Sequence, residues 1–189
     1  AERCATNADS AARFGKEVRG RIGAVFSMLS TDDTELAQTT LAALGNFTSD
    51  EFDPPPRATR DALAGQDYWL ALMNWAELGD VPSKILACAV LQNSCVHHAS
   101  ASAAVQAGAE SLLRALLSSP EEPLRVLAAA ALDNLQALAD EAAAAAAAEA
   151  ESALQGLRAA EPSERLEALQ SLALLLDGCT DADAPAAQA

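Results

Sequence analysis

Residues that favour β-strands are scarce in this sequence. Phe, Trp and Tyr make up 4% of the 189 residues, valine and isoleucine are few, and alanine and leucine dominate. Because alanine and leucine favour helices, the composition excludes a sheet-rich fold and predicts an all-α protein with almost no strand. The 51% of hydrophobic residues are enough to build a core, and the length fits one domain.

Basic residues are also few. Lys and Arg total 12 against 27 Asp and Glu, which gives a net charge of −15. A field of this sign repels nucleic acid and anionic lipid head groups and attracts positively charged segments. The charge therefore disfavours DNA or RNA as a partner and favours a basic protein segment. Acidity is also a common way for a protein to stay soluble, and solubility alone is the interpretation that we favour.

Cysteine is limited to Cys4, Cys88, Cys95 and Cys179, which form no CxxC pair and no small disulfide framework. We expect free thiols and an intracellular protein. No apolar run reaches the roughly 18 residues needed to span a membrane, and no segment resembles a signal peptide. The chain starts with Ala1 rather than Met. We therefore expect a fragment or a processed chain, in the cytoplasm or in an organelle whose targeting segment was removed.

Motifs for catalysis and metal binding are missing too. The sequence has no GxSxG, no HExxH and no phosphate-binding glycine loop. Its two histidines, His97 and His98, follow Cys95 closely, but adjacent side chains diverge, so the pattern favours a helix C-terminus over a metal site. We expect no enzyme activity, no metal and no cofactor.

What the sequence does contain is a repeat. An ungapped shift of 88 residues superimposes Gly20–Phe47 on Gly108–Leu135 and matches Asn46 with Asn134. Asn93, in KILACAVLQNS, lies in the same setting between them. A weaker fourth copy, ERLEALQSLALLLDG, has leucine where the amide would be. The period of about 40 residues is typical of armadillo and HEAT arrays.

Each unit divides into three helices, most clearly in the third copy. The segment SASAAVQAG ends at Gly108, which can adopt the left-handed conformation that follows a helix. The next helix, ESLLRALLSS, carries an apolar stripe, and Ser119 with Glu122 has the spacing of a capping box before EPLRVLAAAALDNLQAL. No single unit can bury the apolar face of this third helix, so neighbouring units must stack.

The unit boundaries predict one domain over 1–179, followed by a flexible C-terminal tail over 180–189. The units are about 1–49, 50–98, 99–140 and 141–179, and prolines 54–56 separate the first two. In the fourth unit, the alanine-rich 141–151 is expected to be the short first helix, with a solvated single helix as the alternative.

The segment QAGAESLLRALLSSPEEPLRVLAAAALDNL resembles the armadillo repeat: a glycine after the first helix, a Leu-Leu pair, a short acidic Ser/Pro turn, and a third helix that ends in Ala-Leu-x-Asn-Leu. The similarity covers about residues 15–178. It implies a right-handed superhelical solenoid of about four three-helix repeats, whose third helices line a concave groove. Nuclear-import armadillo proteins carry a tryptophan one turn before the asparagine, but these positions here are Ala42, Ala89 and Ala130.

By this resemblance, Asn46, Asn93 and Asn134 are the candidate groove residues and bind the backbone of an extended partner segment. The alternative is that each amide only bonds to the neighbouring unit and holds the stack together. Trp75 is a candidate exposed anchor for a partner, with a place in the core as its alternative. Trp69, Leu72 and Met73, on the same helix, share one face, which we assign to the core.

We therefore expect a non-catalytic protein-interaction module, an accessory or scaffold subunit of a larger complex, whose oligomeric state the sequence does not indicate. The alternative is an armadillo-type nucleotide-exchange factor or co-chaperone of a heat-shock ATPase, which CVHHASASAAVQAGAESLLRALLSSPEEPLRVLAAAAL also resembles. A third class, enzymes built on helical repeats such as certain pigment lyases, needs a reactive thiol or acid in the groove.

Overall fold

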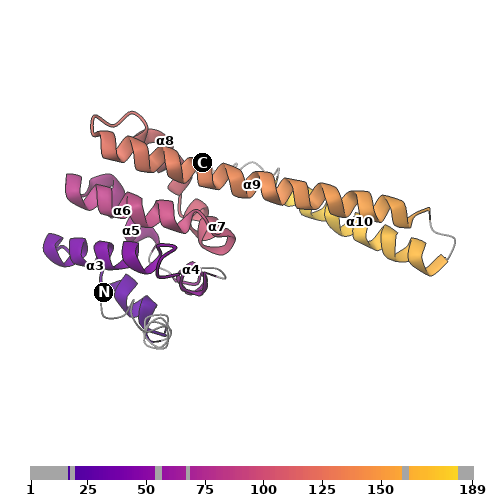
Figure 1. Ribbon diagram of the computed structural model, residues 1–189, viewed down its shortest axis with the longest axis horizontal. Coiled ribbons are helices and arrows are strands. Elements are labelled where there is room, and N and C mark those ends of the chain that lie inside the picture. The colour runs from indigo at the N-terminus through magenta and orange to yellow at the C-terminus, as the bar shows by residue number, and fades with distance from the viewer. Residues whose placement is uncertain (1–16, 18–19, 54–56, 67–68, 159–161, 183–189) are drawn as a thin grey trace, which may run out of the picture. The chain divides into compact units, whose positions relative to one another are not determined.

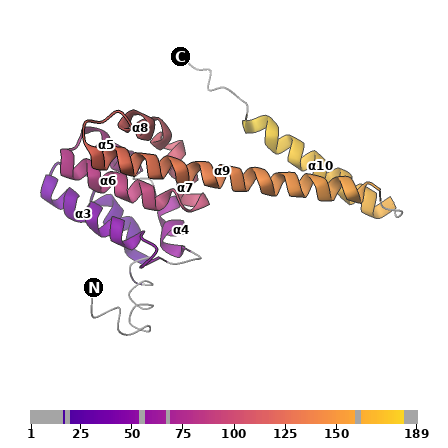
Figure 2. The same ribbon diagram turned by 45° about the horizontal axis from the view of Figure 1, so that its top comes forward.

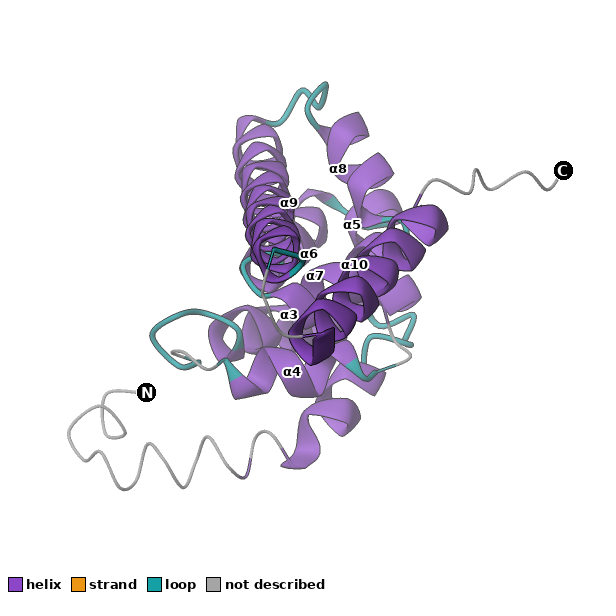
Figure 3. Cartoon of the chain, turned by 90° about the vertical axis from the view of Figure 1, so that its right-hand side faces the viewer, coloured by secondary structure: helices purple, strands orange, loops and turns teal. Residues whose placement is uncertain are grey.

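The computed structural model describes residues 17, 20–53, 57–66, 69–158 and 162–182, with side chains up to residue 174. These residues form helices and the turns between them, and none of them lies in a strand (Figure 3). The all-helical prediction is therefore confirmed. After a helical segment at 20–27, the labelled helices are α3 (Thr34–Phe47), α4 (Ala58–Ala64), α5 (Trp69–Leu78), α6 (Val81–Ser94), α7 (His98–Gln106), α8 (Ala109–Leu116), α9 (Glu122–Gly156) and α10 (Pro162–Ala182).

The chain divides into two compact units, residues 1–138 and 139–189, so it does not form the single unit expected over 1–179. The boundary falls inside α9, which continues through the expected break at 140 and includes the alanine-rich 141–151. The reason is local. Between Pro123 and Gly156 no residue breaks a helix, and the alanine run propagates it. α10 extends to Ala182, past the expected start of the tail, and residues 183–189 lie outside the described part.

In the first unit, helices from different copies of the repeat pack on one another. α3 packs against α6, and α4 packs against α7, while α5 supports α6 from the same copy. Figures 1 and 2 show α6 between α3 and the first part of α9. Neighbouring copies therefore stack through equivalent helices in this unit.

The core of the first unit contains the residues that the helical periodicity indicated. Trp69, Leu72 and Met73 are buried, which confirms their assignment to the core. Leu124 and Ala131 on α9 are buried as well. The other buried apolar residues with large side chains include Ile22, Phe26, Leu29, Leu41, Leu44, Leu63, Val90, Leu91 and Leu113.

Side-chain caps fix where the third helices begin. The Asp33 carboxylate accepts hydrogen bonds from the Glu35 and Leu36 amides at 3.0 and 3.1 Å, and Asp80 accepts one from the Ser83 amide at 3.0 Å. The expected capping box is wrong, because α9 begins at Glu122 and the Ser119 hydroxyl accepts from the amide of Glu121 at 3.2 Å.

Gly108 confirms the turn expected between the first two helices of the third copy. Its φ of 95° lies in the left-handed region, directly before α8 begins at Ala109. Glycine enters this region without the steric cost that a Cβ would add. α7 and α8 are therefore joined by a turn that favours glycine.

In the second unit, the end of α9 and α10 form a helical hairpin. Their contact uses small residues: Ala153 and Ala168 are buried, and a Cβ on Gly156 would lie 2.9 Å from the Ala168 Cβ. Leu166 and Leu174 remain exposed. Among the described residues, no helix combines the length and apolarity needed to cross a bilayer.

Candidate functional site

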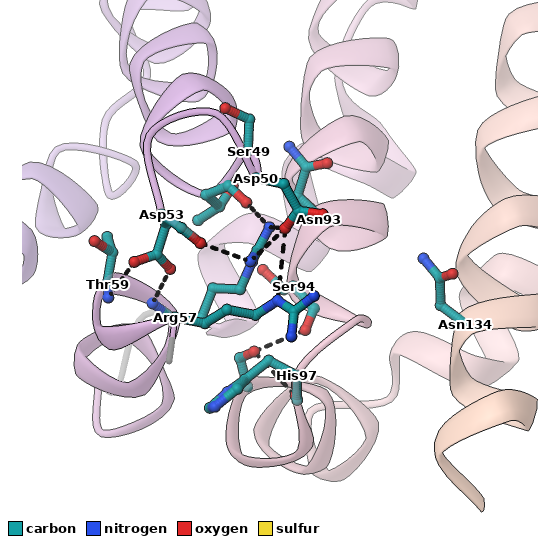
Figure 4. Close-up of polar contacts among 12 residues, drawn as sticks. Ser49, Asp50, Asp53, Arg57, Thr59, Asn93, Ser94, His97 and Asn134 are labelled. Atoms are coloured by element: carbon teal, nitrogen blue, oxygen red, sulfur yellow. Dashed lines mark hydrogen bonds and ion pairs between the residues drawn. The ribbon is translucent and has the colours of Figure 1, made fainter. Parts of the chain in front are cut away.

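Two of the three repeated asparagines donate the same hydrogen bond. The Asn93 Nδ2 donates to the carbonyl of Gly45 on α3 at 3.0 Å, and the Asn134 Nδ2 donates to the carbonyl of Gln92 on α6 at 3.2 Å. In both cases the acceptor is the residue immediately before the asparagine of the preceding copy. Figure 4 shows Asn93 and Asn134 on separate helices. Each amide therefore links two neighbouring third helices.

These bonds match the interpretation in which the amide holds the stack together. Asn93 and Asn134 are half-buried, whereas Asn46, on the first of the three helices, is exposed. The three asparagines thus have equivalent places in the repeat but different surroundings. A repeated polar residue on an apolar helix is consistent with either role, so the sequence alone could not distinguish them.

A row of alanines accompanies the asparagines. Ala42, Ala89 and Ala130 each lie four residues before an asparagine, which places alanine and asparagine on the same side of the helix. Ala42 is exposed, and the other two are half-buried. We call these six residues the third-helix face: Ala42, Asn46, Ala89, Asn93, Ala130 and Asn134.

Helix α3 is followed by a buried polar cluster that sequence reasoning missed. Arg60 is 1% exposed and donates hydrogen bonds to the Thr48 carbonyl, to Asp50 Oδ1 at 3.0 Å and to the Asp53 carbonyl at 3.3 Å. Asp53 accepts from the amides of Thr59 and Arg60 at 2.8 and 3.0 Å, the first of which Figure 4 shows. Burial lowers the pKa of the Arg60 guanidinium, and its hydrogen bond to Asp50 opposes this shift. The cluster fixes α4 against the end of α3.

Trp75 is half-buried rather than exposed, which corrects the expectation of an exposed anchor. Its indole Nε1 donates to the Leu29 carbonyl at 2.9 Å, and the ring packs against the core. Trp75 instead forms part of the wall of an open surface pocket, which we call the α5 pocket. Its lining is Leu29, Ser30, Thr31, Asp32, Leu70, Ala71, Asn74, Trp75, Leu78 and Gly79.

The thiols that an enzyme would need are buried. Cys88 and Cys95 are both free and fully buried. Burial raises the pKa of the Cys88 thiol to about 11 and that of Cys95 to about 12. Because the thiolate is the reactive form, neither residue is suited to nucleophilic chemistry near neutral pH. Cys4 and the Cys179 side chain lie outside the described residues.

A Cys4→Ser/Cys179→Ser variant retains only Cys88 and Cys95. We expect it to react with a thiol reagent at pH 8 at least about 100-fold more slowly when folded than when denatured. The reason is that both thiols are buried and their pKa is raised by about two units or more. Since the folded pKa exceeds the unfolded one, these thiols stabilise the fold below about pH 9, and that stability is lost as the pH rises towards 11. Rapid labelling of one thiol per folded chain would contradict this and revive the enzyme class.

The histidines begin a helix and do not end one. α6 ends at Ser94, His97 occupies the N-cap position of α7 without a side-chain capping bond, and His98 is the first residue of α7. The His97 Nε2 lies 3.4 Å from Asp61 Oδ1. Within the described part of the chain, no three His, Cys, Asp or Glu residues are grouped so that they could hold a metal ion.

Comparison with known proteins gives a likeness in fold alone. A search with the sequence matched no protein-family model and no curated protein. Among solved structures, the chain is similar to the crystal structure of an engineered protein from the Northeast Structural Genomics Consortium, with a TM-score of 0.52 and 23% identity. The match covers 84% of this chain and 64% of that one, so it spans less than two thirds of the engineered protein.

Proposed function

We propose that this chain is a non-catalytic protein-interaction module, an accessory or scaffold subunit of a larger complex, built from armadillo-like repeats in a right-handed solenoid. Its binding site is the third-helix face. The partner is an extended or basic protein segment, in keeping with the net charge of −15. The likeness of the fold to the engineered protein is compatible with this proposal but carries no information on the partner.

The observation that carries the proposal is the pair of asparagine bonds. Because Asn93 and Asn134 bond to equivalent carbonyls, α3, α6 and α9 are held in matching register. The register aligns the three alanines into one row next to the three asparagines. Small side chains allow a bound backbone to approach the helices closely, and the Asn amide oxygens can accept its N–H groups. A regular strip of this kind fits an extended peptide, because the backbone N–H groups of such a peptide recur at regular intervals.

Selection of peptides from a random displayed library tests the proposal. We expect peptides selected on the wild-type chain to bind an Ala89→Gln/Ala130→Gln variant at least about tenfold more weakly, because the longer side chains fill the strip. The matched control is Ala115→Gln, which enlarges an exposed alanine on α8, outside the third-helix face.

Two results would contradict the proposal. Selected peptides could bind all three proteins equally, which would place the binding surface elsewhere. Alternatively, the chain could accelerate nucleotide release from a heat-shock ATPase without binding any peptide, which would favour the co-chaperone alternative.

A further inference from the structure

Helices α5 and α8 occupy equivalent places in two copies of the repeat but differ on their outer side. Their buried residues align with a shift of 40, so that Trp69 matches Ala109 and Met73 matches Leu113, all buried. The same shift matches the exposed residues of α5, Leu70, Asn74 and Leu78, with Glu110 and Arg114 of α8 and with Ser118, which lies in the turn after α8.

In the third copy all three matched residues are polar, whereas on α5 two of the three, Leu70 and Leu78, are apolar. Arg114 pairs with Glu110 at 2.6 Å on the surface of α8. On α5, Leu70 is 67% exposed and Leu78 is 77% exposed. Packing of the repeat does not explain these leucines, because α8 packs with polar residues at the same places. Large exposed apolar side chains next to a pocket are typical of a binding surface.

The two leucines border the α5 pocket, which has a size suited to a ligand segment. Its volume is about 740 Å³, and it runs beside α5 from Leu70 to Leu78. The eight residue steps from Leu70 to Leu78 span about 12 Å, or two turns of a helix lying alongside. The pocket can therefore accept apolar side chains from successive turns of a partner helix.

The wall of the pocket is held in place before any ligand binds. The Trp75 indole donates to the Leu29 carbonyl, and both residues line the pocket. Gly79 closes one end, where a Cβ would lie 2.5 Å from the Trp75 carbonyl oxygen. A wall fixed in this way reduces the ordering entropy lost when a partner binds.

The carboxylates near the pocket favour a partner that carries positive charge. Asp32 is the one charged residue in the lining, and the exposed Glu77 lies next to Leu78 on α5. Asp80 follows directly after Gly79, and hydrogen bonds from Ser83 lower the pKa of its carboxyl group. The exposed leucines beside the Asp32 carboxylate complement a segment that carries leucine-sized side chains flanked by lysine or arginine.

We propose that the α5 pocket is a second protein-interaction surface, separate from the third-helix face, and that it binds a short amphipathic helix with basic edges. Leucines of that helix pack between Leu70, Trp75 and Leu78, and a lysine or arginine reaches Asp32. This surface does not depend on the third-helix face, since it uses the second helix of a copy and the turn before α3.

The test uses the full chain and two synthetic amphipathic helices of about four turns, one of leucine and lysine and one of leucine and glutamate with the same apolar face. We expect the leucine–lysine peptide to bind with micromolar affinity and the leucine–glutamate peptide to bind at least about tenfold more weakly. Binding is followed by anisotropy of a labelled peptide. Leu70→Glu/Leu78→Ser, which copies the matched residues Glu110 and Ser118 of the third copy, should weaken binding at least about tenfold while circular dichroism and melting stay unchanged.

Further variants separate this surface from the other candidates. Asp32→Asn should weaken binding and reduce its salt dependence, whereas Ala89→Gln/Ala130→Gln on the third-helix face should leave it unchanged. Equal binding of both peptides, or equal binding to Leu70→Glu/Leu78→Ser, would overturn the proposal. Loss of binding only with Ala89→Gln/Ala130→Gln would assign the peptide to the third-helix face instead. Self-association of the free chain that the leucine variant abolishes would show that a second copy occupies the pocket.

Discussion

Replacement of Arg60 by methionine is expected to lower the free energy of unfolding of the first unit by about 3 to 5 kcal/mol, the range typical for breaking a buried ionic hydrogen-bond network. Arg60 is 1% exposed, and its guanidinium contacts the carbonyls of Thr48 and Asp53 and the carboxylate of Asp50. Methionine fills a similar volume but donates no hydrogen bond, so buried carbonyls lose their partner. Urea denaturation followed by tryptophan fluorescence measures the loss, because both tryptophans, Trp69 and Trp75, lie in this unit.

Arg60→Lys is the matched control. Lysine retains the charge but cannot reach three acceptors with one ammonium group, so we expect an intermediate loss of about 1 to 2 kcal/mol. If the methionine variant were as stable as the wild type, the hydrogen bonds of the Arg60 guanidinium would not stabilise the fold. The cluster would then not fix α4 against α3.

Phe26→Ala is expected to destabilise the same unit by about 3 to 5 kcal/mol. Phe26 is fully buried in the helical segment at 20–27, and its ring meets the ring of Trp69 edge to face, with centroids 5.6 Å apart. Truncation removes this contact and leaves a cavity between the first copy of the repeat and α5, which the rigid neighbouring helices can fill only in part.

Phe26→Leu keeps most of the volume and should cost about 1.5 kcal/mol or less in the same urea titration. Its Trp69 emission should still change, because the edge-to-face contact is lost. Equal urea midpoints for the alanine, leucine and wild-type proteins would mean that the ring is not packed in the core.

Sequence reasoning succeeded where one residue type has one physical role. Gly108 takes a positive φ, as expected, because glycine enters the left-handed region without the steric cost of a Cβ. Trp69, Leu72 and Met73 could be assigned to the core because their spacing puts them on one face of a helix.

The wrong or missed predictions have a common cause. They concern features that depend on neighbouring residues in the helix or on residues that only the fold brings together. The repeat period predicted a break near 140, but helix propagation through the alanine run prevailed, because nothing there ends a helix. Arg60 resembles a surface residue in sequence, and only the acceptors around it in the fold allow its burial. The α5 pocket involves a turn and a helix about 40 residues apart, and only the comparison of Leu70 and Leu78 with the outward residues of α8 could have signalled it.

The asparagine bonds also bear on how such a chain can grow in evolution. The second copy carries both a donor, Asn93, and an acceptor carbonyl one residue earlier, Gln92, so it is complementary to a copy on either side. A tandem duplication of one copy therefore inherits both halves of the junction and needs no compensating mutation. A deletion or insertion of a single residue within a third helix rotates donor and acceptor apart by about 100°. We expect array length among descendants of this chain to change in steps of whole copies.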